Sequence, residues 1–97
     1  MENAKVMLSR PVTAYGEEVV AFELREPEGH EVRMIGSPIV FRDDGSYDFN
    51  MDRIAKYVVL LSTPKLTPSA VDKISAGDWL PMAGALSPFF VPSTPKT

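Results

Sequence analysis

The chain has 97 residues, of which 44% are hydrophobic and 24% charged, and this composition is typical of one small globular domain. It contains no cysteine and a single histidine, which excludes disulfides, thiolate metal sites and cysteine nucleophiles and argues against histidine-based metal sites and catalytic triads. No apolar run is long enough to span a membrane and the N-terminus has no signal-peptide core, so we expect a protein of the cytosol.

The net charge of −3 is unevenly distributed along the chain. Residues 1–48 contain ten acids and five bases, whereas residues 49–97 contain three acids and five bases. Proteins that bind nucleic acid gather Lys and Arg on one face, and the five bases of the second half are scattered. We therefore expect no nucleic-acid partner.

Two alternating runs near the N-terminus, residues 5–12 and 18–25, predict the strands of an antiparallel hairpin. They are joined by a turn in which Gly16 is free to take a positive φ. Because an isolated hairpin is marginally stable in water, we expect one face of the second strand to pack on the helices. That face carries Val20, Phe22 and Leu24.

The segment 28–35 predicts one or two helical turns, with Val32 and Ile35 facing inward and Gly36 ending the helix. His30 lies in this segment, and the chain has no second histidine with which it could share a metal. We expect His30 at the surface or at the helix cap.

A second hairpin is predicted by two short β-prone runs, residues 39–41 and 47–49, on either side of the turn signal Asp44-Gly45. The acids of this segment also raise the question of a calcium loop, which needs regularly spaced oxygen ligands, a glycine at position 6 and a glutamate at position 12. Neither the spacing nor the glutamate fits when the loop is started at Asp43 or Asp44. The turn is therefore the preferred interpretation of Asp43, Asp44 and Asp48.

Residues 50–62 predict the first helix of an aliphatic block that extends to Phe90. Asn50 is a suitable N-cap and Asp52 suits the positive end of the helix. Val59 and Leu60 fall outside the main apolar stripe, so the helix is apolar over more than one face. The stripe itself consists of Met51, Ile54, Ala55, Val58 and Leu61.

Two further helices complete the block. Thr67 caps a short helix with Pro68 at its first position and an apolar edge, and Gly77 ends it. Asp78 is predicted to cap the last helix, which Pro88 should kink or end. The apolar edge of the short helix is Ala70, Val71 and Ile74, and the stripe of the last helix is Trp79, Met82, Ala83, Leu86, Phe89 and Phe90.

These patterns together predict an α+β fold: an N-terminal antiparallel β-hairpin, a variable middle segment, and a C-terminal three-helix block. We expect a single domain over residues 1–90 and a disordered, proline-rich tail over residues 91–97. The sequence has no Gly-rich phosphate loop, no Ser/His/Asp arrangement and no metal-ligand spacing, so we expect no catalytic site, no metal, no cofactor and no enzymatic activity.

The helical block has more apolar surface than a short hairpin can cover. The surplus meets the protein's own core, a second copy or a client protein, and we predict that a protein-binding surface lies here. The candidate residues are Tyr57, Leu60, Leu61, Trp79, Met82, Phe89 and Phe90.

The order of several segments resembles a known family. These segments are Leu8-Ser-Arg-Pro-Val12, Val20-Ala-Phe-Glu-Leu-Arg-Glu-Pro27, Leu66-Thr-Pro-Ser-Ala-Val-Asp-Lys-Ile74, and the helix from Asp78 to Phe89-Phe90. Over residues 5–90 the chain is similar to the small tail assembly chaperones of Mu-like contractile-tailed bacteriophages and prophages. Residues 36–49, with Ser37-Pro38 and an Asp-Asp-Gly turn, depart from the family pattern.

This resemblance implies a role without catalysis. Such a chaperone binds the tape measure protein in the bacterial host cytoplasm, keeps it soluble during tail assembly and is absent from the finished virion. The family also implies a longer, frameshifted form that recruits the tail tube protein. An alternative function is a structural or scaffolding phage subunit that acts through homo-oligomerisation.

Overall fold

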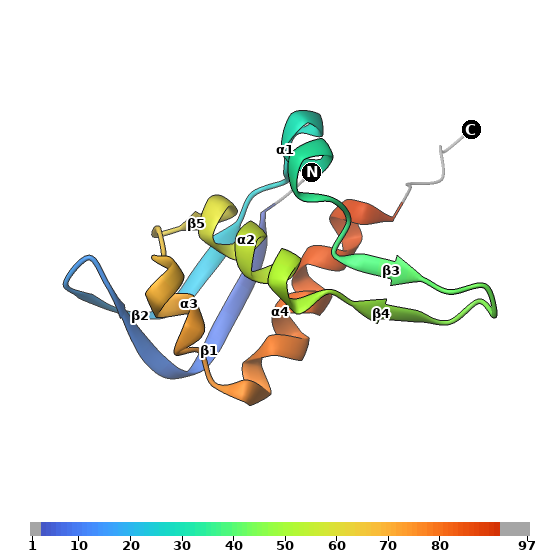
Figure 1. The fold of residues 1–97 in the computed structure, drawn as a ribbon. Helices are drawn as coiled ribbons and strands as arrows, with labels where there is room; N and C mark the ends of the chain where they lie inside the picture. Colours follow the sequence, from blue (N-terminus) through green and yellow to red (C-terminus); the bar gives the residue numbers. More distant parts are fainter. Residues whose placement is uncertain (1–2, 92–97) are drawn as a thin grey trace, which may run out of the picture.

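The computed structural model describes residues 3–91 and has an α+β architecture, which confirms the predicted fold class (Figure 1). An antiparallel hairpin comes first, a short helix and a second hairpin follow, and the helical block comes last. The elements are β1 (Ala4–Ala14), β2 (Glu17–Leu24), α1 (Gly29–Ile35), β3 (Ile39–Phe41), β4 (Tyr47–Phe49), α2 (Met51–Leu61), β5 (Ser62–Thr63), α3 (Pro68–Asp72), a 3₁₀ turn at Ala76–Asp78, α4 (Trp79–Leu86) and a second 3₁₀ turn at Ser87–Phe90.

The larger sheet has the strand order β1-β2-β5 and is antiparallel throughout. Ala14 pairs with Glu17, so only two residues form the turn between β1 and β2. Both have a positive φ, 52° at Tyr15 and 78° at Gly16. Such a turn matches the right-handed twist of the flanking strands, and this explains why a glycine stands at the second position.

The pairing of β1 with β2 contains an irregularity that changes which residues face the core. Met7 lies opposite Ala21 and Val12 opposite Val19, so four residues of β1 face Val20 alone. Val20 is 52% exposed, while Val19 is buried. The prediction that Val20 shares the buried face of Phe22 and Leu24 is therefore wrong, because side chains alternate along a strand only while the register is regular.

The larger sheet packs against α2, α3 and α4, and one apolar cluster joins these elements. Because α2 and α4 each turn a face inward, their largest side chains meet those of the hairpin. The core includes Val6, Val12, Val19, Phe22, Leu24, Ile54, Tyr57, Val58, Leu61, Leu66, Val71, Met82 and Leu86.

The helix termini follow the predicted capping residues in two cases out of three. The Asn50 side chain accepts from the Arg53 N–H at 3.1 Å, and the Thr67 hydroxyl accepts from the Ala70 N–H at 3.0 Å. Asp78 precedes α4, but its side chain makes no cap bond. Instead its Oδ2 accepts from the backbone N–H and the hydroxyl of Ser9, at 3.0 and 2.9 Å, so the predicted cap is replaced by a bond to β1.

The middle of the chain contains the predicted helix and the predicted second hairpin. Val32 and Ile35 of α1 are half-buried, and His30 is exposed, as expected. The β3–β4 hairpin extends away from the larger sheet and the helices (Figure 1). Ile39 anchors it in the protein, and Arg42 pairs with Asp48 on the hairpin itself. Residues 92–97, part of the predicted tail, lie outside the described residues.

Candidate functional site

The seven predicted binding residues do not form one exposed surface. Three of them, Tyr57, Leu61 and Met82, are at most 1% exposed and belong to the core. They are buried because α2 and α4 direct these positions onto the sheet. The remaining four are half-buried and have surface that a partner could contact, and their role in binding stays a prediction. These four are Leu60, Trp79, Phe89 and Phe90.

Two of the aromatic residues hold neighbouring elements together. The Tyr57 hydroxyl donates to the Gly36 carbonyl at 2.7 Å, and its ring meets Phe90 edge-on with the ring centroids 5.1 Å apart. Burial raises the pKa of Tyr57, so its hydroxyl keeps the proton that it donates. The Trp79 indole N–H donates to the Ile74 carbonyl at 3.3 Å. Both side chains therefore have a structural role at the joints between helices.

An apolar groove lies between α2 and α3, and we call it the α2–α3 groove. Its volume is about 580 Å³, and the turn of the first hairpin borders it through Tyr15. Leu60 is the only one of the seven predicted binding residues that lines it. The other apolar lining residues are Ala55, Val59, Leu66, Pro68 and Val71.

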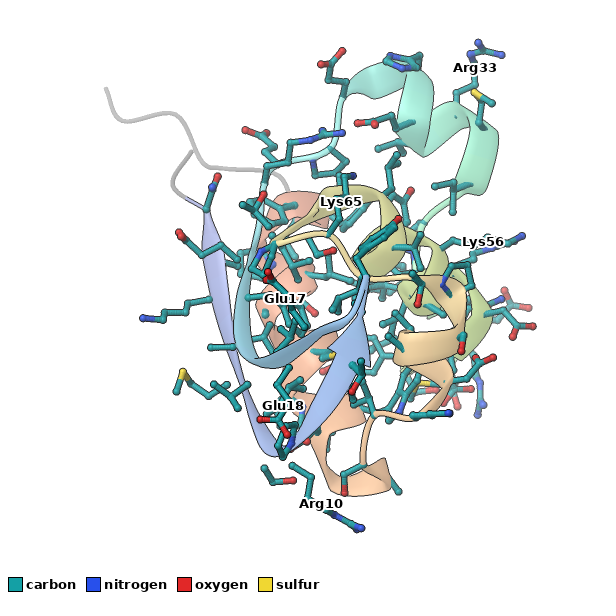
Figure 2. The ribbon with its side chains drawn as sticks, turned by 90° about the vertical axis from the view of Figure 1, so that its left-hand side faces the viewer. Arg10, Glu17, Glu18, Arg33, Lys56 and Lys65 are labelled. Atoms are coloured by element: carbon teal, nitrogen blue, oxygen red, sulfur yellow. The ribbon has the colours of Figure 1, made fainter. Side chains whose placement is uncertain are left out.

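Charged side chains stand at the walls of this groove. Lys56 comes from α2, Lys65 from the segment after β5, and Asp72 from the end of α3. The Lys65 amine donates to the Leu60 carbonyl at 2.6 Å, which holds it beside the last turn of α2. Within residues 3–91, Lys56 has no ion-pair partner. Figure 2 views the molecule from this side and labels both lysines.

A second apolar surface lies on the β3–β4 hairpin. Phe41 and Tyr47 are 71% and 56% exposed, with their ring centroids 6.1 Å apart, and Tyr47 also meets Phe49 at 5.7 Å. Where the hairpin meets the end of the helical block there is a small cavity of about 200 Å³. It is lined by Ile39, Phe41, Tyr47, Ser87 and Val91.

Sequence reasoning missed most of the residues that form these two surfaces. The sequence does indicate the α2 side of the groove, because Val59 and Leu60 are apolar but fall outside the main apolar stripe of their helix. Tyr15 and Pro68 carried no such signal, since each was assigned to a turn or to a helix start. The signal for the hairpin was the alternation of aromatic residues at positions 41, 47 and 49.

The buried acids of the described chain are occupied by structural bonds. Asp78 is held by Ser9, as described above. Glu31 accepts from both Nη atoms of Arg25, at 2.9 and 2.7 Å, and from the Glu28 N–H at 2.8 Å. The Arg25 bond, followed by the backbone bond, lowers the pKa of Glu31 to about 2. Both carboxylates therefore fix the fold.

Residues 3–91 hold neither a candidate metal site nor a candidate membrane-spanning helix. This part of the chain has no group of three or more His, Cys, Asp or Glu side chains placed to hold a metal ion. None of its helices is long and apolar enough to cross a membrane.

Comparison with known proteins identifies a family. The model of a family described as "Phage tail assembly chaperone proteins, E, or 41 or 14" matches residues 5–91, which is nearly the whole chain. Comparisons with curated proteins and with solved structures found no match.

Proposed function

Since this chain belongs to the family of phage tail assembly chaperones, we propose that it binds the tape measure protein and keeps it soluble while the tail is assembled. In this role the chain acts in the bacterial host cytoplasm, catalyses no reaction and is absent from the finished virion. A longer form of the same protein would bring the tail tube protein to the complex.

The α2–α3 groove is the observation that carries this proposal. A long helical client exposes apolar stripes until it is packed into a tail, and such stripes aggregate in water. An amphipathic helix places its apolar face into a hydrophobic groove of a partner in a common mode of peptide recognition. The groove has about 580 Å³ and six apolar lining residues besides Tyr15, which is within the size range of sites that bury a ligand.

The proposal predicts that Leu60→Asp abolishes the protection of the client. Burial of one leucine side chain contributes about 1.5–3 kcal/mol, so its loss weakens binding by at least about tenfold. The chain is co-expressed with the tape measure protein, and the soluble fraction of the latter is measured. Wild type should keep most of the tape measure protein soluble, and Leu60→Asp should leave it in the pellet.

Leu80→Asp provides the matched control, because Leu80 is 65% exposed on α4 and does not line the groove. It should protect the client as wild type does, and circular dichroism checks that both variants are folded. The proposal fails if wild type leaves the tape measure protein insoluble. The assignment to the groove fails if a folded Leu60→Asp variant protects as well as Leu80→Asp.

A second candidate function is a structural or scaffolding subunit that acts through homo-oligomerisation. The exposed Phe41 and Tyr47 of the β3–β4 hairpin favour it, since paired aromatic residues on a projecting element are common at interfaces. The mass of the purified chain in solution distinguishes the two functions. A stable assembly that leaves the tape measure protein insoluble would replace the chaperone function by this one.

A further inference from the structure

We propose that the α2–α3 groove selects a client helix whose apolar stripe is flanked by two acidic residues one helical turn apart, on the side that faces α2. This inference rests on the proposed function and adds to it the chemistry of the segment that is bound. It follows from the dimensions of the groove and from the position of its charges.

The length of the groove limits the bound segment. Its α2 wall extends from Ala55 to Leu60, and five residue steps in an α-helix correspond to about 7.5 Å. About one and a half turns of a client helix fit along such a wall, which is enough for apolar side chains at positions i and i+3 or i+4. A short apolar contact of this kind discriminates poorly between client helices. The charged side chains at the walls of the groove therefore contribute much of the specificity for one client helix over another.

The two lysines are held at successive turns of α2, Lys56 as part of the helix and Lys65 through its bond to the last turn, and we call this pair the lysine row. The Lys65 amine is bonded to the Leu60 carbonyl, and Leu60 lies four positions after Lys56. Four positions in a helix correspond to one turn, so the two points of α2 at which these side chains are held are about 6 Å apart along the helix axis. Acidic side chains at positions i and i+4 of a client helix have the same spacing and would each meet one lysine.

The opposite wall carries the opposite charge. Asp72 lines the groove from α3. The chain as a whole has a net charge of −3, so the lysine row is a local reversal of its charge. A helix with its acidic flank against α2 satisfies both walls, whereas the reversed helix places like charges together.

A second copy of this chain does not supply such a helix. Within residues 3–91, each of α1, α2 and α3 contains one acid, and α4 contains none. The acid of α1 is Glu31, which is buried against Arg25. No described helix therefore offers two acids one turn apart, so a second copy of the chain would not meet both lysines with one helix.

Two designed helical peptides test the inference. They share one stripe of leucines at i, i+4 and i+7, and differ only in having Glu or Lys at two positions one turn apart on a single flank, the other flank being uncharged. Fluorescence anisotropy measures the binding of each labelled peptide to wild type and to the double variant Lys56→Glu, Lys65→Glu. Exposed ion pairs contribute about 0.2–1 kcal/mol each, so exchanging two attractions for two repulsions gives roughly a tenfold preference.

Wild type should prefer the Glu-flanked peptide by roughly tenfold, and the double variant should prefer the Lys-flanked peptide. The double variant Arg10→Glu, Arg33→Glu is the control of equal net charge, and Figure 2 shows both arginines away from the two lysines. It should keep the wild-type preference. For wild type alone, the preference should shrink as salt rises from about 0.05 to about 0.5 M, which tests the electrostatic origin without any variant.

Equal affinity of wild type for the two peptides would overturn the inference, and so would the failure of both peptides to bind. A preference for the Glu-flanked peptide that survives in the lysine double variant would also overturn it. A self-associating wild type whose assembly is lost in Leu60→Asp would also overturn it, because the groove would then hold a second copy. These failures leave the proposed function intact if wild type still keeps the tape measure protein soluble. Insolubility of that protein with wild type would instead reject the proposed function.

Discussion

At the scale of single residues, the polar side chains inside this protein join segments that are distant in sequence. Asp78 ties the start of α4 to Ser9 on β1, and Tyr57 ties α2 to the Gly36 carbonyl. The sequence showed Asp78 as a plausible helix cap, but it could not show Ser9 nearby, because these two residues are 69 positions apart. Asn50 and Thr67 were predictable as capping residues, because the backbone N–H that each one binds lies only three positions further along the chain.

The Glu31 carboxylate predicts a pH-dependent contribution to stability. Its folded pKa of about 2 lies below the ordinary value of 4.5, so its contribution is complete above the ordinary value and is lost as the pH falls through 4.5 towards 2. Solvent screens the pair, since the side chain of Arg25 is 42% exposed, and we expect a contribution of about 1–2 kcal/mol.

Urea unfolding of wild type and Glu31→Gln at several pH values measures this contribution. The free energies of unfolding should differ by about 1–2 kcal/mol at pH values of about 6, and the difference should shrink towards a pH of about 2. A difference that is constant with pH would show that the charge of Glu31 is not its cause.

At the scale of elements, the hairpins and helices were predictable because each has a local signal. Glycine turns, proline and capping residues mark the ends of the elements, and hydrophobic periodicity marks their type. The register of β1 against β2 was not predictable, because the irregularity between Met7 and Val12 depends on the partner strand. The strand β5, two residues long, pairs with the end of β2 only because α2 brings it there.

The changed register predicts opposite results for two neighbouring valines. Val19→Thr places a hydroxyl in the core and should cost about 1–3 kcal/mol. Val20→Thr changes an exposed position and should alter the free energy of unfolding by less than about 0.5 kcal/mol. Urea unfolding of both variants is the measurement. Equal costs, or a larger cost at Val20, would contradict the register of this hairpin.

At the scale of the whole molecule, the α2–α3 groove exists only because three parts of the chain meet. The wall from α2 could be anticipated from Val59 and Leu60, which are apolar but outside the main stripe. The wall from α3 and the contribution of Tyr15 could not, since they depend on how the first hairpin packs against the helices. For the same reason the sequence placed Tyr57, Leu61 and Met82 among the candidate binding residues although they fill the core.

The central claim is that the tape measure protein binds in this groove, and site-specific photo-crosslinking in cells that produce both proteins tests it most directly. A photoreactive amino acid replaces Val59 in the groove, Met34 on the exposed side of α1, or Phe41 on the β3–β4 hairpin. If the client lies in the groove, position 59 should crosslink to the tape measure protein and position 34 should give no crosslink above background. Crosslinking from position 34 or 41 without any from position 59 would contradict it.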